Sequence, residues 1–259
     1  MFPDLHFLNL HLSTYFLTIS LDFCFLLFCL KHRSQKLGFP VRLSLDIGIF
    51  SAIGGFIGAR LFHVFYEHPE FYFSHPLFIF KIWLGGFVFL PGIISGLFVG
   101  IGLLKFHKQK ILQWLDLFSP IISLGYAIGR WACFFQGCCY GTQTNSIFGV
   151  HFEQLQNNGE NFARLPVQIF TSITEFLIFL GLLFIEKNKS RSLKSGQLFT
   201  FWIIAHSINR MIMELLRDDP RGPLFAGFGV SFWLSLILFS LGSTALIFRK
   251  NANNQIDLL

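Results

Sequence analysis

Charge is what this 259-residue chain has least of. Only 13% of its residues are Asp, Glu, Lys or Arg, whereas about 25% is usual in soluble domains. The mean hydropathy is +0.58, and 53% of the residues are hydrophobic, with 36 Phe among them. A soluble core does not need so much apolar surface spread evenly along the chain. The composition therefore excludes an ordinary soluble domain and indicates an integral membrane protein.

The chain also lacks a fixed-period repeat, a low-complexity linker and the alternating pattern of barrel strands. Its apolar residues form seven stretches close to the length that spans a bilayer. They cover residues 14–30, 44–66, 82–104, 111–130, 166–186, 198–216 and 229–248. Because backbone groups in lipid must bond within the segment, such runs predict helices. We therefore predict an all-α polytopic fold, a single transmembrane domain over 1–259, with a polar extramembrane arm at about 142–165.

Basic residues set the orientation. Most of the 20 Lys and Arg residues lie in the loops after the first, third and fifth stretches and at the C-terminus. The positive-inside rule then predicts an outside N-terminus and a cytoplasmic C-terminus. The net charge of +6 indicates contact with anionic membrane lipids. We expect no nucleic-acid partner, because the charges are scattered over short loops.

The first candidate site residue is Arg130, which ends an apolar stretch and precedes the turn Gln136–Gly141. An arginine at membrane depth is costly, so it usually faces a protein interior, an aqueous cavity or an anionic partner. This placement predicts a site for an anionic ligand that opens at the outer membrane edge.

The second candidate is a stripe of ionisable residues in the sixth stretch. His206, Arg210, Glu214 and Arg217 are spaced by four, four and three residues, so a helix places them on one face. One interpretation is internal pairing of the arginines with Glu214. The other is ligand binding by an arginine that Glu214 orients, and the two are compatible.

Other residues allow two interpretations each. Tyr15 is either an interfacial aromatic or part of the site, and Arg60 either snorkels or lines a cavity. Cys133, Cys138 and Cys139 lie near the outer face, where oxidation is possible. Their C-x4-C-C spacing is a weak match to a zinc site, so we expect no metal.

These pieces together resemble the prolipoprotein diacylglyceryl transferases of bacteria. Residues 129–141 read GRWACFFQGCCYG, preceded by Asp116 and Pro120. Further similar pieces follow the family's order: Tyr15, Gly58-Ala59-Arg60, KIWLGG at 81–86, LPVQIF at 165–170 and R-x3-E-x2-R at 210–217. The resemblance implies a seven-span protein of the bacterial cytoplasmic (inner) membrane with its N-terminus outside.

The resemblance also implies an enzyme that needs no cofactor. Such enzymes transfer the diacylglyceryl group of phosphatidylglycerol to the thiol of the lipobox cysteine in a prolipoprotein signal peptide, and form a thioether. By position, Arg130 is the lipid contact and Arg210 the second essential arginine. Further site positions are then Tyr15, Gln136, Gly137, Gly141, Arg60, Glu214 and Arg217.

The chain departs from the family at the positions that would accept or release protons in the reaction. The family's third-span histidine aligns with Leu90, which cannot take a proton. Cys133 and Cys138 replace an asparagine and a glutamate, and His206 stands where a tyrosine is usual. A working transferase would then use His206 as the relocated base. Two alternatives stay open: a divergent member that binds an anionic lipid without transferring it, and a thiol-dependent membrane redox or carrier protein.

Overall fold

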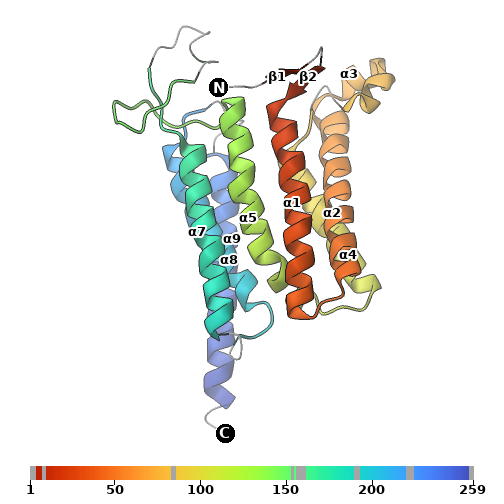
Figure 1. The fold of residues 1–259 in the computed structure, drawn as a ribbon, viewed down its shortest axis with the longest axis vertical. Coiled ribbons are helices and arrows are strands. Elements are labelled where there is room, and N and C mark those ends of the chain that lie inside the picture. The colour runs from red at the N-terminus through yellow and green to blue at the C-terminus, as the bar shows by residue number, and fades with distance from the viewer. Residues whose placement is uncertain are drawn as a thin grey trace. The chain divides into compact units, whose positions relative to one another are not determined.

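The computed structural model of this chain consists almost entirely of helices (Figure 1). It describes residues 4–7, 10–82, 86–152, 155, 162–189, 193–219 and 225–256. The long helices are α1 (Thr14–Leu37), α2 (Val41–Phe62), α4 (Phe89–Phe106), α5 (Ile111–Gln136), α7 (Val167–Lys189), α8 (Gln197–Leu216) and α9 (Val230–Ile256). Shorter elements are α3 (Pro69–Ser74), a π-helical turn (His63–Glu67) and a 3-10 turn (Pro76–Phe80).

Each of the seven predicted stretches overlaps one long helix, which confirms the helical fold. The sequence did not indicate the small antiparallel hairpin of β1 (Asp4–Phe7) and β2 (Leu10–Ser13) before α1. Five described segments are long and apolar enough to cross a membrane. They are Thr14–Leu37, Val41–Glu67, Ile111–Gln136, Val167–Asn188 and Val230–Phe248. The apolar part of α4 is shorter, at Pro91–Phe106, and α8 carries the ionisable stripe.

The outer faces of these helices are unusually apolar. Phe98 is 72% exposed, Phe184 66% and Leu241 61%. A water-soluble protein rarely presents large contiguous apolar surface, whereas lipid tails solvate it well. The exposed residues therefore agree with a membrane protein.

The helix of the third predicted stretch, α4, begins later than predicted. We predicted helix from residue 82, but α4 starts at Phe89. Gly86 has a φ of +80°, which a continuing helix does not allow. Pro91 lies in the first turn of α4, where a missing N–H costs nothing. Residues 83–85 of the KIWLGG piece lie outside the described residues.

Asp116 has a clear structural role. Its carboxylate accepts hydrogen bonds from the backbone N–H groups of Gly196 (2.5 Å) and Phe199 (2.9 Å) at the start of α8. The first N–H groups of a helix have no partner within it, and the helix dipole favours an anion there. A residue of α5 thus caps the start of α8. This contact fixes where α8, with its stripe of ionisable residues, begins beside α5.

The contacts divide the chain into two compact units, one formed by Met1–Leu26 with Leu115–Leu259 and the other by Leu27–Trp114. We call them the larger and the smaller unit. In the larger unit, α8 packs against both α7 and α9. The single transmembrane domain stays a prediction.

A glycine seam holds the smaller unit together. The paired helices are α2 and α4, and small residues let their backbones approach closely. A Cβ added at Gly96 would lie 2.8 Å from the carbonyl oxygen of Ser51, and one at Gly55 would lie 3.0 Å from that of Gly92. No larger side chain fits between these backbones.

We therefore expect Gly96→Leu to destabilise the protein by about 1–3 kcal/mol, the usual cost of overpacking. Gly102→Leu is the matched control, because a Cβ at Gly102 on the same helix meets no atom within 4 Å. Thermal unfolding in detergent measures both variants. Equal unfolding midpoints for the two would contradict the seam.

Candidate functional site

Polar faces of α5, α7 and α8 meet inside the larger unit. On α5 the polar residues Ser123, Tyr126, Arg130 and Cys133 recur every three or four positions, which places them on one face. The predicted stripe of α8 faces them. Figure 1 shows α5, α7 and α8 running alongside one another.

Glu175 of α7 lies at the centre of this polar region and is fully buried. Its carboxylate accepts hydrogen bonds from His206 Nδ1 (2.7 Å), Asn209 Nδ2 (2.9 Å) and Ser123 Oγ (3.1 Å). Thr174 Oγ1 in turn donates to Asn209 Oδ1 (2.8 Å). A buried carboxylate is tolerated only with such partners. One side chain thereby joins three helices.

The bond to Glu175 orients His206. Since Nδ1 donates to the carboxylate, the nitrogen left to take a proton is Nε2. The imidazole stacks on Trp202, with ring centroids 5.3 Å apart, and meets the ring of Tyr126 edge-on at 4.8 Å. His206 is therefore held in one orientation against α5.

Tyr126 connects His206 to Arg130. Arg130 Nη2 donates a hydrogen bond to the Tyr126 hydroxyl, and the guanidinium carbon lies 4.5 Å from the centre of the same ring. Arg210 interacts electrostatically with both Tyr126 and Arg130. Two arginines on separate helices therefore converge around one tyrosine.

Arg210 and Arg217 share Glu214 but differ in their other contacts. Arg210 Nη2 lies 3.0 Å from Glu214 Oε2, and Arg217 Nη1 lies 3.8 Å from the same oxygen. Arg217 also makes a two-pronged contact with Asp219, at 2.9 and 2.7 Å. The internal pairing with Glu214 is thus present and is closer for Arg210 than for Arg217, while Arg217 has Asp219 as a further partner.

Among the described residues, the contacts of Arg130 and Arg210 use only part of their guanidinium N–H donors. Within the described ranges, the guanidinium of Arg130 donates a hydrogen bond to Tyr126, and that of Arg210 forms an ion pair with Glu214. A guanidinium has five N–H donors. This pair is therefore suited to binding a further anion, and phosphate matches the planar fork.

The predicted turn at Gln136–Gly141 follows the C-terminal end of α5. Gln136 is the last residue of the helix, and Gly137 follows with a φ of +74°, which suits a residue without a side chain. A Cβ on Gly141 would lie 2.8 Å from the carbonyl oxygen of Leu216 and 2.6 Å from Val167. Both glycines therefore serve backbone geometry and close packing.

The predicted arm packs back on this turn. Backbone bridges join Gln143 and Val150 to Arg164, and Arg164 Nη1 pairs with Asp218 at 2.6 Å. Gln168 Nε2 donates to the carbonyl oxygen of Cys138 (2.6 Å). Residues 153–154 and 156–161 of the arm lie outside the described residues.

Arg130 lies close to Tyr15 and to the thiols of Cys133, Cys138 and Cys139. Tyr15 interacts electrostatically with all three thiols and with Arg130, so α1 contributes to this region. Hydrogen bonds from the thiols of Cys133 and Cys138 hold the pKa of the Cys139 thiol well below its ordinary value, and Arg217 and Arg130 add to the effect.

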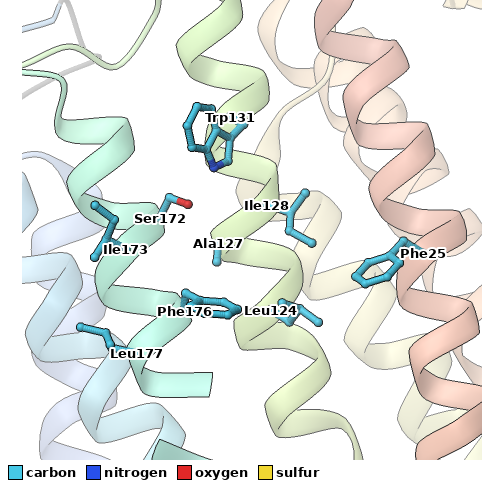
Figure 2. Close-up of a pocket in the computed structure, with 9 residues that line it drawn as sticks. All are labelled: Phe25, Leu124, Ala127, Ile128, Trp131, Ser172, Ile173, Phe176 and Leu177. Atoms are coloured by element: carbon cyan, nitrogen blue, oxygen red, sulfur yellow. The ribbon is translucent and has the colours of Figure 1, made fainter. Parts of the chain in front are cut away.

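The other face of α5 lines an apolar groove of about 410 Å³. Figure 2 shows Phe25 of α1 turned toward Leu124 and Ile128 of α5. The groove is completed by Ala127 and Trp131 of α5 and by Ser172, Ile173, Phe176 and Leu177 of α7. Since Trp131 follows Arg130 directly, one helix presents a cationic face and an apolar face side by side.

Arg60 belongs to the smaller unit and is buried. Its guanidinium donates to the carbonyl oxygens of Ile79 (3.3 Å), Gly86 (3.1 Å) and Phe78 (2.8 Å) and lies over the ring of Tyr72. These contacts fix the turn before α4. Arg60 thus acts as a structural clamp, and its predicted contact with substrate stays a prediction.

Sequence reasoning missed Glu175, Tyr126 and Asn209. Glu175 was detectable, because an acidic residue within an apolar stretch is costly unless it has partners or a function. Tyr126 and Asn209 gave no such signal, since their importance depends on neighbours from other helices.

We expect Glu175→Gln to lower stability by about 1–3 kcal/mol, because the new amide donor must face His206, Asn209 or Ser123, which are donors themselves. The measurement is thermal unfolding in detergent. Glu70→Gln, at an exposed position of α3, is the control and should unfold like the wild type. An unchanged midpoint for Glu175→Gln would show that the carboxylate does not hold the three helices together.

Comparison with known proteins identifies the family of this chain. The profile of prolipoprotein diacylglyceryl transferases matches residues 4–248. A phosphatidylglycerol–prolipoprotein diacylglyceryl transferase of Clostridium tetani is 32% identical over 82% of this chain and 83% of its own length. A second one, of Clostridium perfringens, is 33% identical over 77% of this chain and 76% of its own length. The chain belongs to the prolipoprotein diacylglyceryl transferase family.

Proposed function

We propose that this protein transfers the diacylglyceryl group of phosphatidylglycerol to the lipobox cysteine thiol of prolipoproteins. The observation that carries the proposal is the convergence of Arg130 and Arg210 around Tyr126, beside the apolar groove on the same helix. A phospholipid has a phosphate next to two acyl chains, and this site has both complements. Family membership supplies the reaction.

The arginines suit the chemistry. The substrate sulfur attacks a glycerol carbon, a C–S bond forms, and the C–O bond to the phosphate breaks with its electron pair leaving on the phosphate ester. Guanidinium groups stabilise both the bound anion and the charge that develops on the leaving oxygen. Arg130 and Arg210 fill this role in the proposal. Glu214 and Arg217 position Arg210, and Tyr15, Gln136, Gly137 and Gly141 shape the outer rim.

His206 is the proposed base. Its orientation by Glu175 leaves Nε2 for proton uptake, as in other carboxylate–histidine pairs. The edge of its ring contacts Tyr126, which binds Arg130. The proton acceptor and the phosphate-binding arginines are thus neighbours.

The proposed topology follows from the charges. Seven helices span the bacterial inner membrane, with the N-terminus outside and the C-terminus in the cytoplasm. α8 is sheltered by α7 and α9, which lets its stripe cross the bilayer. The turn at Gln136–Gly141 then lies at the outer surface, where secreted precursors arrive.

Complementation tests the proposal. Expression in bacteria depleted of their own transferase should restore lipid modification of a precursor, followed by radiolabelled lipid or by mass. If the protein is well expressed in the membrane and still binds phosphatidylglycerol without restoring modification, the alternative of a lipid binder without this activity is correct.

Arg130→Ala and Arg210→Ala should each lower the transfer rate by roughly 10²–10³-fold, as expected when a charge-stabilising donor is lost. Arg→Lys at either position should recover little activity, because the two-pronged contact is lost. Lys187→Ala, on the exposed end of α7, is the control. The assay is thioether formation in membranes at saturating lipid. Activity within a few-fold of wild type in either alanine variant would contradict the assignment.

His206→Phe should reduce transfer strongly, by at least about 10²-fold, which is the usual contribution of a positioned base. His151→Phe in the exposed arm is the matched control and should be fully active. Wild-type rates for His206→Phe would rule out the relocated base while leaving the two arginines as proposed.

A further inference from the structure

Three thiols gather at the outer end of α5. The Sγ atoms of Cys133, Cys138 and Cys139 all lie within 4.8 Å of one another. The spacing C-x4-C-C did not predict this, because it has no second pair of ligands. The fold of the turn is the reason that they meet.

The turn reverses the chain directly after the helix. Gly137 adopts a φ of +74°, and the N–H of Cys138 then bonds back to the carbonyl oxygen of Cys133 at 3.1 Å. Cys139 adopts a φ of +65°, a region that L-residues other than glycine seldom occupy. Both cysteines are thereby brought back over the last turn of α5.

The distances suit one thiophilic ion. Three sulfurs bound tetrahedrally to zinc at about 2.3 Å are about 3.8 Å apart. The observed limit of 4.8 Å is about 1 Å above this separation. Gln168, which bonds to the carbonyl oxygen of Cys138 at 2.6 Å, holds the turn in place from α7.

Nearby arginines compensate the negative charge that a cluster of three thiolates and one zinc ion would carry. Three thiolates and one divalent cation carry a net charge of −1. Arg130 and Arg217 both interact electrostatically with Cys139, so two positive groups face the cluster. Soft thiolate ligands select zinc over magnesium or calcium.

We propose that Cys133, Cys138 and Cys139 bind one zinc ion, and that its fourth position takes the thiol of the precursor. The second half rests on the proposed function. Zinc sites with three protein ligands keep a fourth position for water or substrate, and a thiol that coordinates the ion is deprotonated.

Transfer of the diacylglyceryl group to the precursor thiol needs no oxidant. The S–H bond would break as the precursor thiol coordinates, and its proton would pass to His206, the proposed base. Sulfur then bonds to the glycerol carbon, and the C–O bond breaks with its electron pair on the phosphate ester beside Arg130. The thioether product is a poor ligand and leaves. This arrangement prepares a thiolate in a chain that has Leu90 at the position of the family's third-span histidine.

Cobalt titration of the detergent-purified, reduced protein tests the site. Wild type should bind one equivalent of Co²⁺ with the visible absorption of a tetrahedral thiolate complex, and Zn²⁺ should displace it. Cys138→Ser and Cys139→Ser should each bind at least tenfold more weakly. Cys24→Ser, an exposed cysteine of α1, is the control and should bind like wild type. Addition of a lipobox peptide with a free cysteine should shift the cobalt spectrum, and the same peptide with serine should not.

Absence of cobalt binding by the fully reduced wild type, or a spectrum that the cysteine peptide leaves unchanged, would overturn the inference. Transfer activity tells it apart from the proposed function. Full transfer after metal removal would overturn the zinc site and leave the transferase standing. Cobalt and peptide binding without any lipid transfer would support the site and overturn the transferase. Arg210→Ala should keep the metal and lose transfer.

Discussion

The buried carboxylate of Glu175 is the interaction on which the rest of the larger unit depends. It lies where water does not reach, and its charge is tolerated because α5 and α8 supply three donors to it. Those donors are drawn from the same helix faces that carry Arg130 and Arg210. The register of the three helices is therefore set by the requirement to satisfy one carboxylate, and the convergence of the arginines follows from that register.

Helix α5 combines the two properties that a phospholipid needs. Its 3.6-residue period separates the face with Tyr126 and Arg130 from the face with Leu124 and Trp131. In the proposed site, a phosphate at the first face would place the acyl chains along the second. Asp116 caps α8, the helix that carries Arg210.

The sequence predicted much of this because lipid restricts what a chain can do. Helices were predictable from apolar runs, and the α8 stripe from spacing alone. The late start of α4 was not, since Gly86 and Pro91 act through local backbone geometry that hydropathy ignores. Glu175 was visible as a charge in an apolar stretch, whereas its partners Asn209 and Ser123 became meaningful only through contacts between helices. Arg60 shows the opposite case: an arginine of the family pattern donates to three backbone carbonyls.

The cysteines show how a departure from the family can be read physically. The resemblance implies an asparagine and a glutamate at the positions of Cys133 and Cys138, and cysteine at both positions introduces polarizable sulfur. Taken with Cys139, whose strained backbone turns its thiol toward the other two, the changes create a set of soft ligands facing two guanidinium groups. The gathering of three thiols within 4.8 Å of one another is the observation behind the proposed thiol chemistry at this site.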